Sequence, residues 1–177
     1  MVAVLFRISR PNVAELGHVP GTRRFRDLDR FEQAVRMKDI MVLRVDASFS
    51  FANAEYFKDF ILEKSEREGR SVEVVVVDGS SINDLDTTAI GALFSVVESL
   101  QEMGIELHIT GLIGPVREVV RRSGLYGLLG EDHFHLDPHE AVVDVLERWD
   151  AQDGGSRVED YFVTTEPEKK EATPAAS

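Results

Sequence analysis

The sequence predicts a single α/β domain in which a largely parallel β-sheet is flanked by about four helices. The first observation is a β-branched apolar run at residues 72–77, which is typical of a strand buried on both faces. The second is an apolar stripe at helical spacing that follows this run after a short polar loop. The third is that strand and helix patterns alternate along most of the chain, which predicts right-handed βαβ crossovers.

The central segment is the strand at 72–77, its loop at 78–85 and the helix that follows. Asp86 is expected to cap this helix, because its carboxylate can accept hydrogen bonds from free N–H groups of the first turn. Asp86, Thr87 and Thr88 would then lie at the N-terminal end of this helix, its mouth. Ligands and modifications tend to occur at this position in open α/β sheets. Gly104 is expected to end the helix. The predicted buried stripe consists of Ile90, Leu93, Phe94, Val97 and Leu100.

The segments before the central strand predict two strands and a helix. Residues 13–19 form the first expected strand, which ends at the turn-forming pair Pro20 and Gly21. Residues 22–38 are basic and mixed, and we expect a loop with one helical turn. Alternation over residues 41–47 predicts a half-buried strand. Asn53 is expected to cap a helix that runs to about residue 68.

The segments after the central helix predict one more strand and two more helices. In residues 105–110, apolar positions alternate with Glu106, His108 and Thr110, which predicts a strand with one solvated face. Pro115 suits the first turn of the next helix. Asp137 and Glu140 resemble a capping pair for a last helix that runs through Trp149.

The composition is that of an ordinary globular protein of 177 residues, with 43% hydrophobic and 29% charged residues. The net charge of -12 argues against nucleic acid as a partner, because phosphate binding needs clustered basic residues. The absence of cysteine excludes disulfides and thiolate metal sites. From residue 151 onward few residues are apolar, so we expect a disordered acidic tail over 151–177, in which VEDYFVTT is a candidate docking segment.

Two clusters of side chains are candidate metal sites. His133, His135 and His139 lie close together, and two of them could share one side of a strand and bind a metal. An exposed loop that leads into a capped helix explains them as well and is the preferred interpretation. Asp78, Asp84 and Asp86 lie in one loop, where turn formation and capping are preferred over a cation site. No catalytic residue, cofactor or metal is therefore assigned.

Two further groups of residues have both a structural and a functional interpretation. Phe49 and Phe51 suit the core at a strand end, with a partner-facing aromatic patch as the alternative. Arg117, Arg121 and Arg122 suit a solvated helix face, with anionic lipid headgroups as the alternative.

Three stretches resemble a known family. RPNVAELGHVPGTRRFRDL is similar to the transporter-to-domain junction of SulP-type anion transporters, the solute carrier 26 group in animals. LRVDASFSFANAEYFKDFI resembles the second strand and first helix of the STAS domain at the cytoplasmic end of those transporters. VVVVDGSSINDLDTTAIGAL resembles the strand, loop and helix start that STAS domains share with bacterial anti-sigma-factor antagonists.

The resemblance implies a mixed sheet and a division into a juxtamembrane junction at 1–11, a STAS domain at 12–150 and the tail. It also implies a non-catalytic, regulatory role at the cytoplasmic face of the membrane. The expected partner is the membrane domain of the same anion transporter, and the chain is expected to be a part cut from that longer protein. Other cytoplasmic proteins, a nucleotide and a second copy in a homodimer are further partners that the resemblance admits.

Two other functions are left open by the resemblance. In the antagonists, a Ser directly after the Asp is phosphorylated by a kinase; Thr87 is the residue in that position here. The alternative function is therefore a free phospho-switch protein of the antagonist type. A nucleotide-binding or nucleotide-hydrolysing domain is the third hypothesis, and it has no motif beyond the helix mouth at Asp86.

Overall fold

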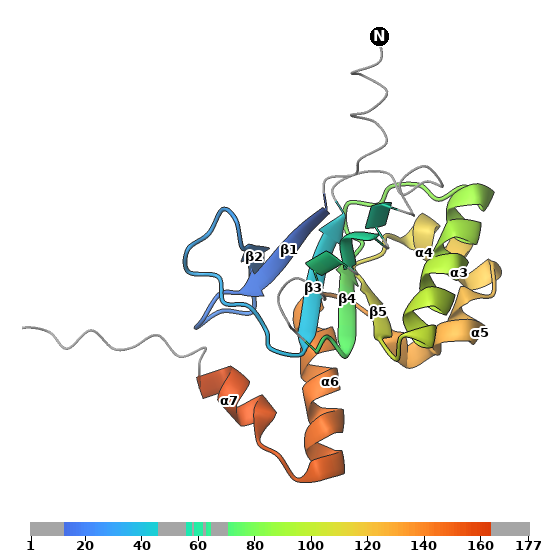
Figure 1. The fold of residues 1–177 in the computed structure, drawn as a ribbon. Helices are drawn as coiled ribbons and strands as arrows, with labels where there is room; N and C mark the ends of the chain where they lie inside the picture. Colours follow the sequence, from blue (N-terminus) through green and yellow to red (C-terminus); the bar gives the residue numbers. More distant parts are fainter. Residues whose placement is uncertain (1–12, 46–55, 58, 62, 65–70, 164–177) are drawn as a thin grey trace, which may run out of the picture.

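The computed structural model describes residues 13–45, 56–57, 59–61, 63–64 and 71–163, and within them one sheet has six strands in the order β2-β1-β3-β4-β5-β6. The neighbours from β3 to β6 are parallel, whereas β1 pairs antiparallel with both β2 and β3. The sheet is therefore mixed and mostly parallel, as predicted (Figure 1). Its strands are β1 (Val13–His18), β2 (Phe25–Asp27), β3 (Ile40–Val45), β4 (Val74–Asp78), β5 (Glu106–Thr110) and β6 (Phe134–His135).

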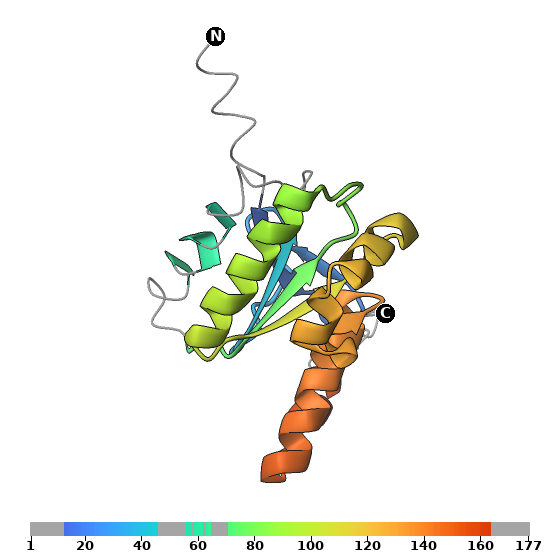
Figure 2. The same cartoon turned by 90° about the vertical axis from the view of Figure 1, so that its right-hand side faces the viewer.

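Helices cover both faces of this sheet and form two separate hydrophobic cores (Figures 1 and 2). One face carries α3 (Thr87–Glu102), α4 (Gly114–Arg122) and α5 (Leu125–Leu129). The opposite face carries α6 (Pro138–Asp153) and α7 (Arg157–Val163). A short 3-10 turn, η1 (Glu131–His133), leads into β6. The domain is thus a three-layer α/β/α arrangement.

Alternate residues of β3 and β4 point into the two cores. Val75 and Val77 face α3, whereas Val74 and Val76 face α6. The prediction that the central strand is buried on both faces is confirmed. The prediction that β3 is half-buried is wrong, because α6 covers the face that carries Ile40 and Val42.

Most of the predicted solvated face of β5 is also closed to water, and only Glu106 at its start stays partly exposed. His108 is 1% exposed and Thr110 is fully buried, since α6 and the segment around β6 pack over them. Period-two alternation of polar residues indicates which side chains share a face, but it cannot tell whether a later helix covers that face. Here the covered face holds a polar cluster.

The helix α3 begins and ends close to the predicted positions. Asp86 is its N-cap, and the chain leaves the helix through Met103 and Gly104, which has a positive φ of 71°. Val97 and Leu100 are fully buried, as the stripe predicted. Phe94 differs, because it is only partly buried and packs at the margin of the core.

The basic segment at 22–38 contains a strand that the sequence did not predict. β2 pairs with β1 through the registers Leu16 to Asp27 and His18 to Phe25. Three residues are too few to show a clear alternation, so local pattern could not distinguish this edge strand from a loop.

The prediction of a disordered tail from residue 151 is wrong for residues 151–163. α6 continues to Asp153, and α7 then folds back against it. Tyr161 is 6% exposed, and its hydroxyl lies 2.8 Å from Nδ1 of His139. Among the described side chains of this segment, Tyr161 and Val158 pack against the core on the α6 face.

Several predictions fall on residues outside the described part of the chain. These are the junction at 1–11, the tail at 164–177, the cap Asn53 and the candidate partner-facing residues Phe49 and Phe51. The described residues between 56 and 64 are helical, with Phe57 and Ile61 buried against the sheet. In the described residues no helix has the length and apolar character needed to cross a bilayer.

Candidate functional site

The mouth of α3 is built around the carboxylate of Asp86. Its Oδ1 accepts hydrogen bonds from the Ala89 N–H at 2.7 Å and from the Thr88 hydroxyl at 2.6 Å. These two donors hold the pKa of Asp86 below its ordinary value, with the Thr88 hydroxyl as the larger cause. Asp86 therefore stays ionised and acts as the cap that the sequence predicted.

Thr87 is the first helical residue and is exposed at this mouth. Within the described part of the chain its hydroxyl has no hydrogen-bond partner, whereas that of Thr88 is bound to Asp86. The first turn of α3 contains no acidic side chain, so the helix macrodipole there is balanced only by Asp86. An added negative charge at Thr87 would lie at the favourable end of that dipole.

The loop that leads to the mouth is fixed by buried anchors. Gly79 donates its N–H to the Thr110 carbonyl at 2.9 Å, and a Cβ at this position would lie 2.8 Å from Leu112 Cδ2. Ile82 and Leu85 are 4% and 5% exposed. The loop therefore presents Asp86 and Thr87 from a rigid base.

Two of the three loop carboxylates, Asp78 and Asp86, have the structural roles that we preferred. Asp78 Oδ1 accepts from the Ser80 N–H at 3.0 Å, which stabilises the turn after β4. Asp86 is the cap, and Asp84 is exposed. None of the three belongs to the one cluster of potential ligand atoms that converges within the described residues.

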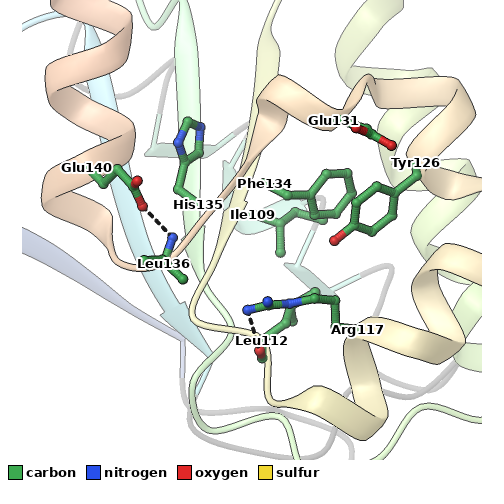
Figure 3. A pocket seen from close by; sticks show the side chains of 9 residues that line it. All are labelled: Ile109, Leu112, Arg117, Tyr126, Glu131, Phe134, His135, Leu136 and Glu140. Carbon is green, nitrogen blue, oxygen red and sulfur yellow. Dashed lines mark hydrogen bonds between the residues drawn. The ribbon is translucent and has the colours of Figure 1, made fainter.

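A half-open cavity of about 300 Å³ lies where β5 and β6 end, next to α4 and α5 (Figure 3). Tyr126 and Phe134 stack on its wall, with ring centroids 3.8 Å apart and planes 2° from parallel. Arg117 donates to the Leu112 carbonyl at 3.1 Å, so this guanidinium is held by the backbone. The cavity is lined partly by aromatic and partly by charged groups.

The other two arginines of α4 point to solvent. Arg121 and Arg122 both pair with Glu118, at 2.7 and 2.6 Å, and their side chains are 66% and 78% exposed. Pairs this exposed contribute little to stability. Arg121 and Arg122 therefore lie on a solvated helix face, which is the interpretation preferred from the sequence.

A cluster of three histidines, one glutamate and one arginine lies on the α6 face of β5 and β6. Glu106 Oε1 lies 3.1 Å from His108 Nε2, 2.9 Å from His133 Nε2 and 2.8 Å from the Arg148 Nη2 that donates to it. His108 Nδ1 and His135 Nε2 are 2.8 Å apart, so one ring donates and the other accepts. The parallel register of β5 with β6 brings these residues together.

The charges in this cluster are strongly coupled. Hydrogen bonds from His108 and His133 hold the pKa of Glu106 far below its ordinary value. The Glu106 carboxylate in turn raises the pKa of His133, whereas burial lowers that of His135. The cluster thus keeps its carboxylate ionised in a largely enclosed place.

Sequence reasoning found only part of this cluster. It grouped His133 and His135 with His139, but His139 lies apart and faces Tyr161. It missed the ligand character of Glu106 and His108, although their i, i+2 spacing matches that of His133 and His135 and signals a shared face. Arg148 comes from α6, 42 residues beyond Glu106, and no local pattern indicates it.

The family model described as the STAS domain matches residues 33–141, which is more than half of the chain. A probable sulfate transporter of Arabidopsis thaliana is 27% identical over 159 residues, covering 85% of this chain and 24% of the relative. A probable sulfate transporter of Mycobacterium tuberculosis is 32% identical over 142 residues, covering 80% of this chain and 25% of the relative. This chain therefore spans about a quarter of the length of these relatives.

Solved structures share the fold at lower sequence identity. The murine Solute Carrier 26 family member A9 anion transporter has a TM-score of 0.71 at 18% identity, covering 82% of this chain and 24% of that one. The STAS domain of a SulP transporter from Vibrio cholerae has a TM-score of 0.58 at 22% identity, with 68% and 91% covered. A putative anti-sigma factor antagonist from Thermotoga maritima has a TM-score of 0.53 at 16% identity, with 63% and 92% covered.

The solved structures agree with the mixed α/β fold described above. The chain belongs to the STAS domain family, and its sequence relatives are sulfate transporters.

Proposed function

We propose that this chain is the non-catalytic regulatory domain of a SulP-type anion transporter and lies on the cytoplasmic side of the membrane. The observation that carries the proposal is the sequence match to sulfate transporters across 78–85% of this chain. Those relatives are about four times as long as the matched region, so the anion pathway would lie in a membrane part joined to this domain. The named anion of the relatives, sulfate, is the proposed cargo.

The mouth of α3 is the surface that we assign to partner docking. Asp86 is ionised, Thr87 is exposed and the loop beneath them is anchored by Ile82 and Leu85. A rigid, polar surface at a helix N-terminus suits recognition of a partner group by backbone N–H donors and a fixed charge. Because the loop is anchored, this surface would lose little conformational entropy when a partner binds.

The phospho-switch of the antagonist type is the second candidate function. It is favoured by one observation, the exposed Thr87 hydroxyl directly after the capping aspartate. A phosphate there would add about -1.5 to -2 charges beside Asp86 at the positive end of α3. The fold would tolerate it, whereas a partner that docks on this surface would meet a changed charge.

The first experiment replaces Thr87 by glutamate in the transporter that contains this chain. Thr87→Glu is expected to leave the melting temperature within a few degrees of wild type and to alter docking of the domain on the membrane part, measured by co-purification. Ser95→Glu is the matched control, because Ser95 is exposed on the same helix, away from the mouth. Unfolding of Thr87→Glu, or an equal effect of both variants, would contradict the docking surface.

The second experiment separates the transporter from the free switch. The coding sequence that adjoins this chain is expected to encode a series of apolar segments of about 20 residues each, the length that crosses a bilayer. A neighbouring kinase gene, together with transfer of phosphate to Thr87 by its product, would favour the free switch instead. Nucleotide turnover that disappears in Asp86→Ala would support the enzymatic hypothesis.

A further inference from the structure

We propose that Glu106, His108 and His133 form a binding site for a divalent transition-metal cation, with Zn²⁺ as the best fit. One potential ligand atom from each of the three residues lies within 4.8 Å of the other two. Two imidazoles and one carboxylate make a common ligand set for such ions, whereas Mg²⁺ and Ca²⁺ prefer oxygen alone. The proposal does not depend on the transporter function.

The distances between the ligand atoms are close to those of a tetrahedral site. A Zn–N bond of about 2.0 Å at a tetrahedral angle separates two ligand atoms by about 3.3 Å. Glu106 Oε1 lies 3.1 Å from His108 Nε2 and 2.9 Å from His133 Nε2. Both histidines thus already direct the same nitrogen, Nε2, toward the same carboxylate oxygen.

The other nitrogen of each histidine has a partner that would orient it as a ligand. His133 Nδ1 lies 3.2 Å from Asp132 Oδ1, and His108 Nδ1 lies 2.8 Å from His135 Nε2. Metal-binding histidines almost always hold their second nitrogen in this way, and a carboxylate is a common partner.

The charges around the site also suit a divalent cation. Three carboxylates surround the site: Arg148 pairs with those of Glu106 and Asp144, whereas that of Asp132 contacts His133. With neutral histidines, two negative charges are in excess, which Zn²⁺ would balance. Arg148 Nη2 lies 2.8 Å from Glu106 Oε1 and 3.3 Å from His108 Nε2. For a cation to bind, this guanidinium would have to move toward Asp144, whose Oδ2 is 3.6 Å from Arg148 Nε.

Metal binding requires one adjustment and has an approach path. The rings of His108 and His133 are stacked at 4.6 Å, so one of them must tilt to direct both lone pairs at one ion. His133 is the one with freedom to tilt, because its side chain is 17% exposed and lines a surface cavity of about 270 Å³. Glu106 lines the same cavity, so solvent can supply the fourth ligand.

The test is calorimetric titration of the untagged 177-residue chain with Zn²⁺, together with thermal melting. One Zn²⁺ per chain and a higher melting temperature are expected. His133→Ala should weaken binding by more than tenfold, and Asp132→Asn by about 10–100-fold, the usual cost of losing a partner of a metal-binding histidine. Bound Co²⁺ should show the visible absorption of a four-coordinate site.

Glu131→Gln is the matched control, because it removes a neighbouring exposed carboxylate that does not contact the cluster. It should bind Zn²⁺ as wild type does. Absence of saturable Zn²⁺ binding, or unchanged affinity in a folded His133→Ala variant, would overturn the proposal. Asp132 is 73% exposed, so Asp132→Asn keeps the test valid if His133→Ala fails to fold.

Discussion

Individual side chains anchor the C-terminal part of this domain to the sheet and to α6. Tyr161 packs its ring 4.6 Å from that of His18 on β1 and places its hydroxyl 2.8 Å from His139 Nδ1 on α6. Burial lowers the pKa of His139 and raises that of Tyr161, so both are neutral in the folded protein near pH 7. The contact joins α7 to both α6 and the sheet.

This contact predicts a pH dependence of stability. Because the folded state depresses the pKa of His139, the unfolded chain takes up a proton near pH 6.5 that the folded chain resists, and stability should fall as pH drops below about 6.5. Arg23 and His18 also disfavour the proton, whereas Asp137 favours it. His139→Gln should show a flatter decrease in melting temperature between pH 7.5 and 5.5. An unchanged pH profile would contradict this role.

The same contact predicts the effect of one hydroxyl. Tyr161→Phe removes the hydrogen bond to His139 but keeps the ring, and should lower the free energy of unfolding by about 0.5–1.5 kcal/mol. Tyr126→Phe is the control, because the Tyr126 hydroxyl has no hydrogen bond within the described residues. Urea unfolding measures both, and equal effects would show that α7 is not held by this bond.

Residue-scale prediction from sequence succeeded where the interaction is local. The cap at Asp86 and the pair Asp137 and Glu140 need only neighbours within three or four positions. The cluster at Glu106 could not be assembled in this way, because it depends on the pairing of β5 with β6 and on Arg148 from α6. Non-local register is not encoded in any short window of the sequence.

At the scale of elements, periodicity predicts a helix better than it predicts how deeply each residue of the stripe is buried. The pattern placed Phe94 and Leu100 in one stripe, yet Leu100 is fully buried and Phe94 lies at the margin of the core. The depth depends on the angle at which α3 crosses the sheet, which the sequence pattern leaves open.

This difference can be measured. Leu100→Ala should cost about 2–5 kcal/mol, because it leaves a cavity in a closed core. Phe94→Ala should cost less than Leu100→Ala in urea unfolding, although phenylalanine is the larger residue. Leu128→Ala, at a position that is 37% exposed, should stay within about 0.5 kcal/mol of wild type. A larger loss of unfolding free energy for Phe94→Ala than for Leu100→Ala would show that the core is centred on Phe94 and not on Leu100.

Across the whole molecule, the centre of the sheet was predicted from the sequence, whereas the strands at its edges and the last helix were not. The parallel centre follows from β-branched strands that alternate with helices, and this frame was predicted. The additions at both ends of the sheet, β2 and β6, have three and two residues, too few for any period to show. α7 was missed because it is short and follows a polar segment; among its described side chains, Tyr161 is buried and Val158 packs against the same core.

We propose that this domain belongs to an anion transporter and controls its activity. The uptake of radiolabelled sulfate tests this proposal, in cells that lack their own sulfate transport and express the full protein containing this chain. Deleting residues 13–163 from that protein should sharply reduce uptake at equal surface abundance, and Thr87→Glu should change uptake while Ser95→Glu should not. Uptake that is the same with and without this domain, at equal abundance, would contradict the account.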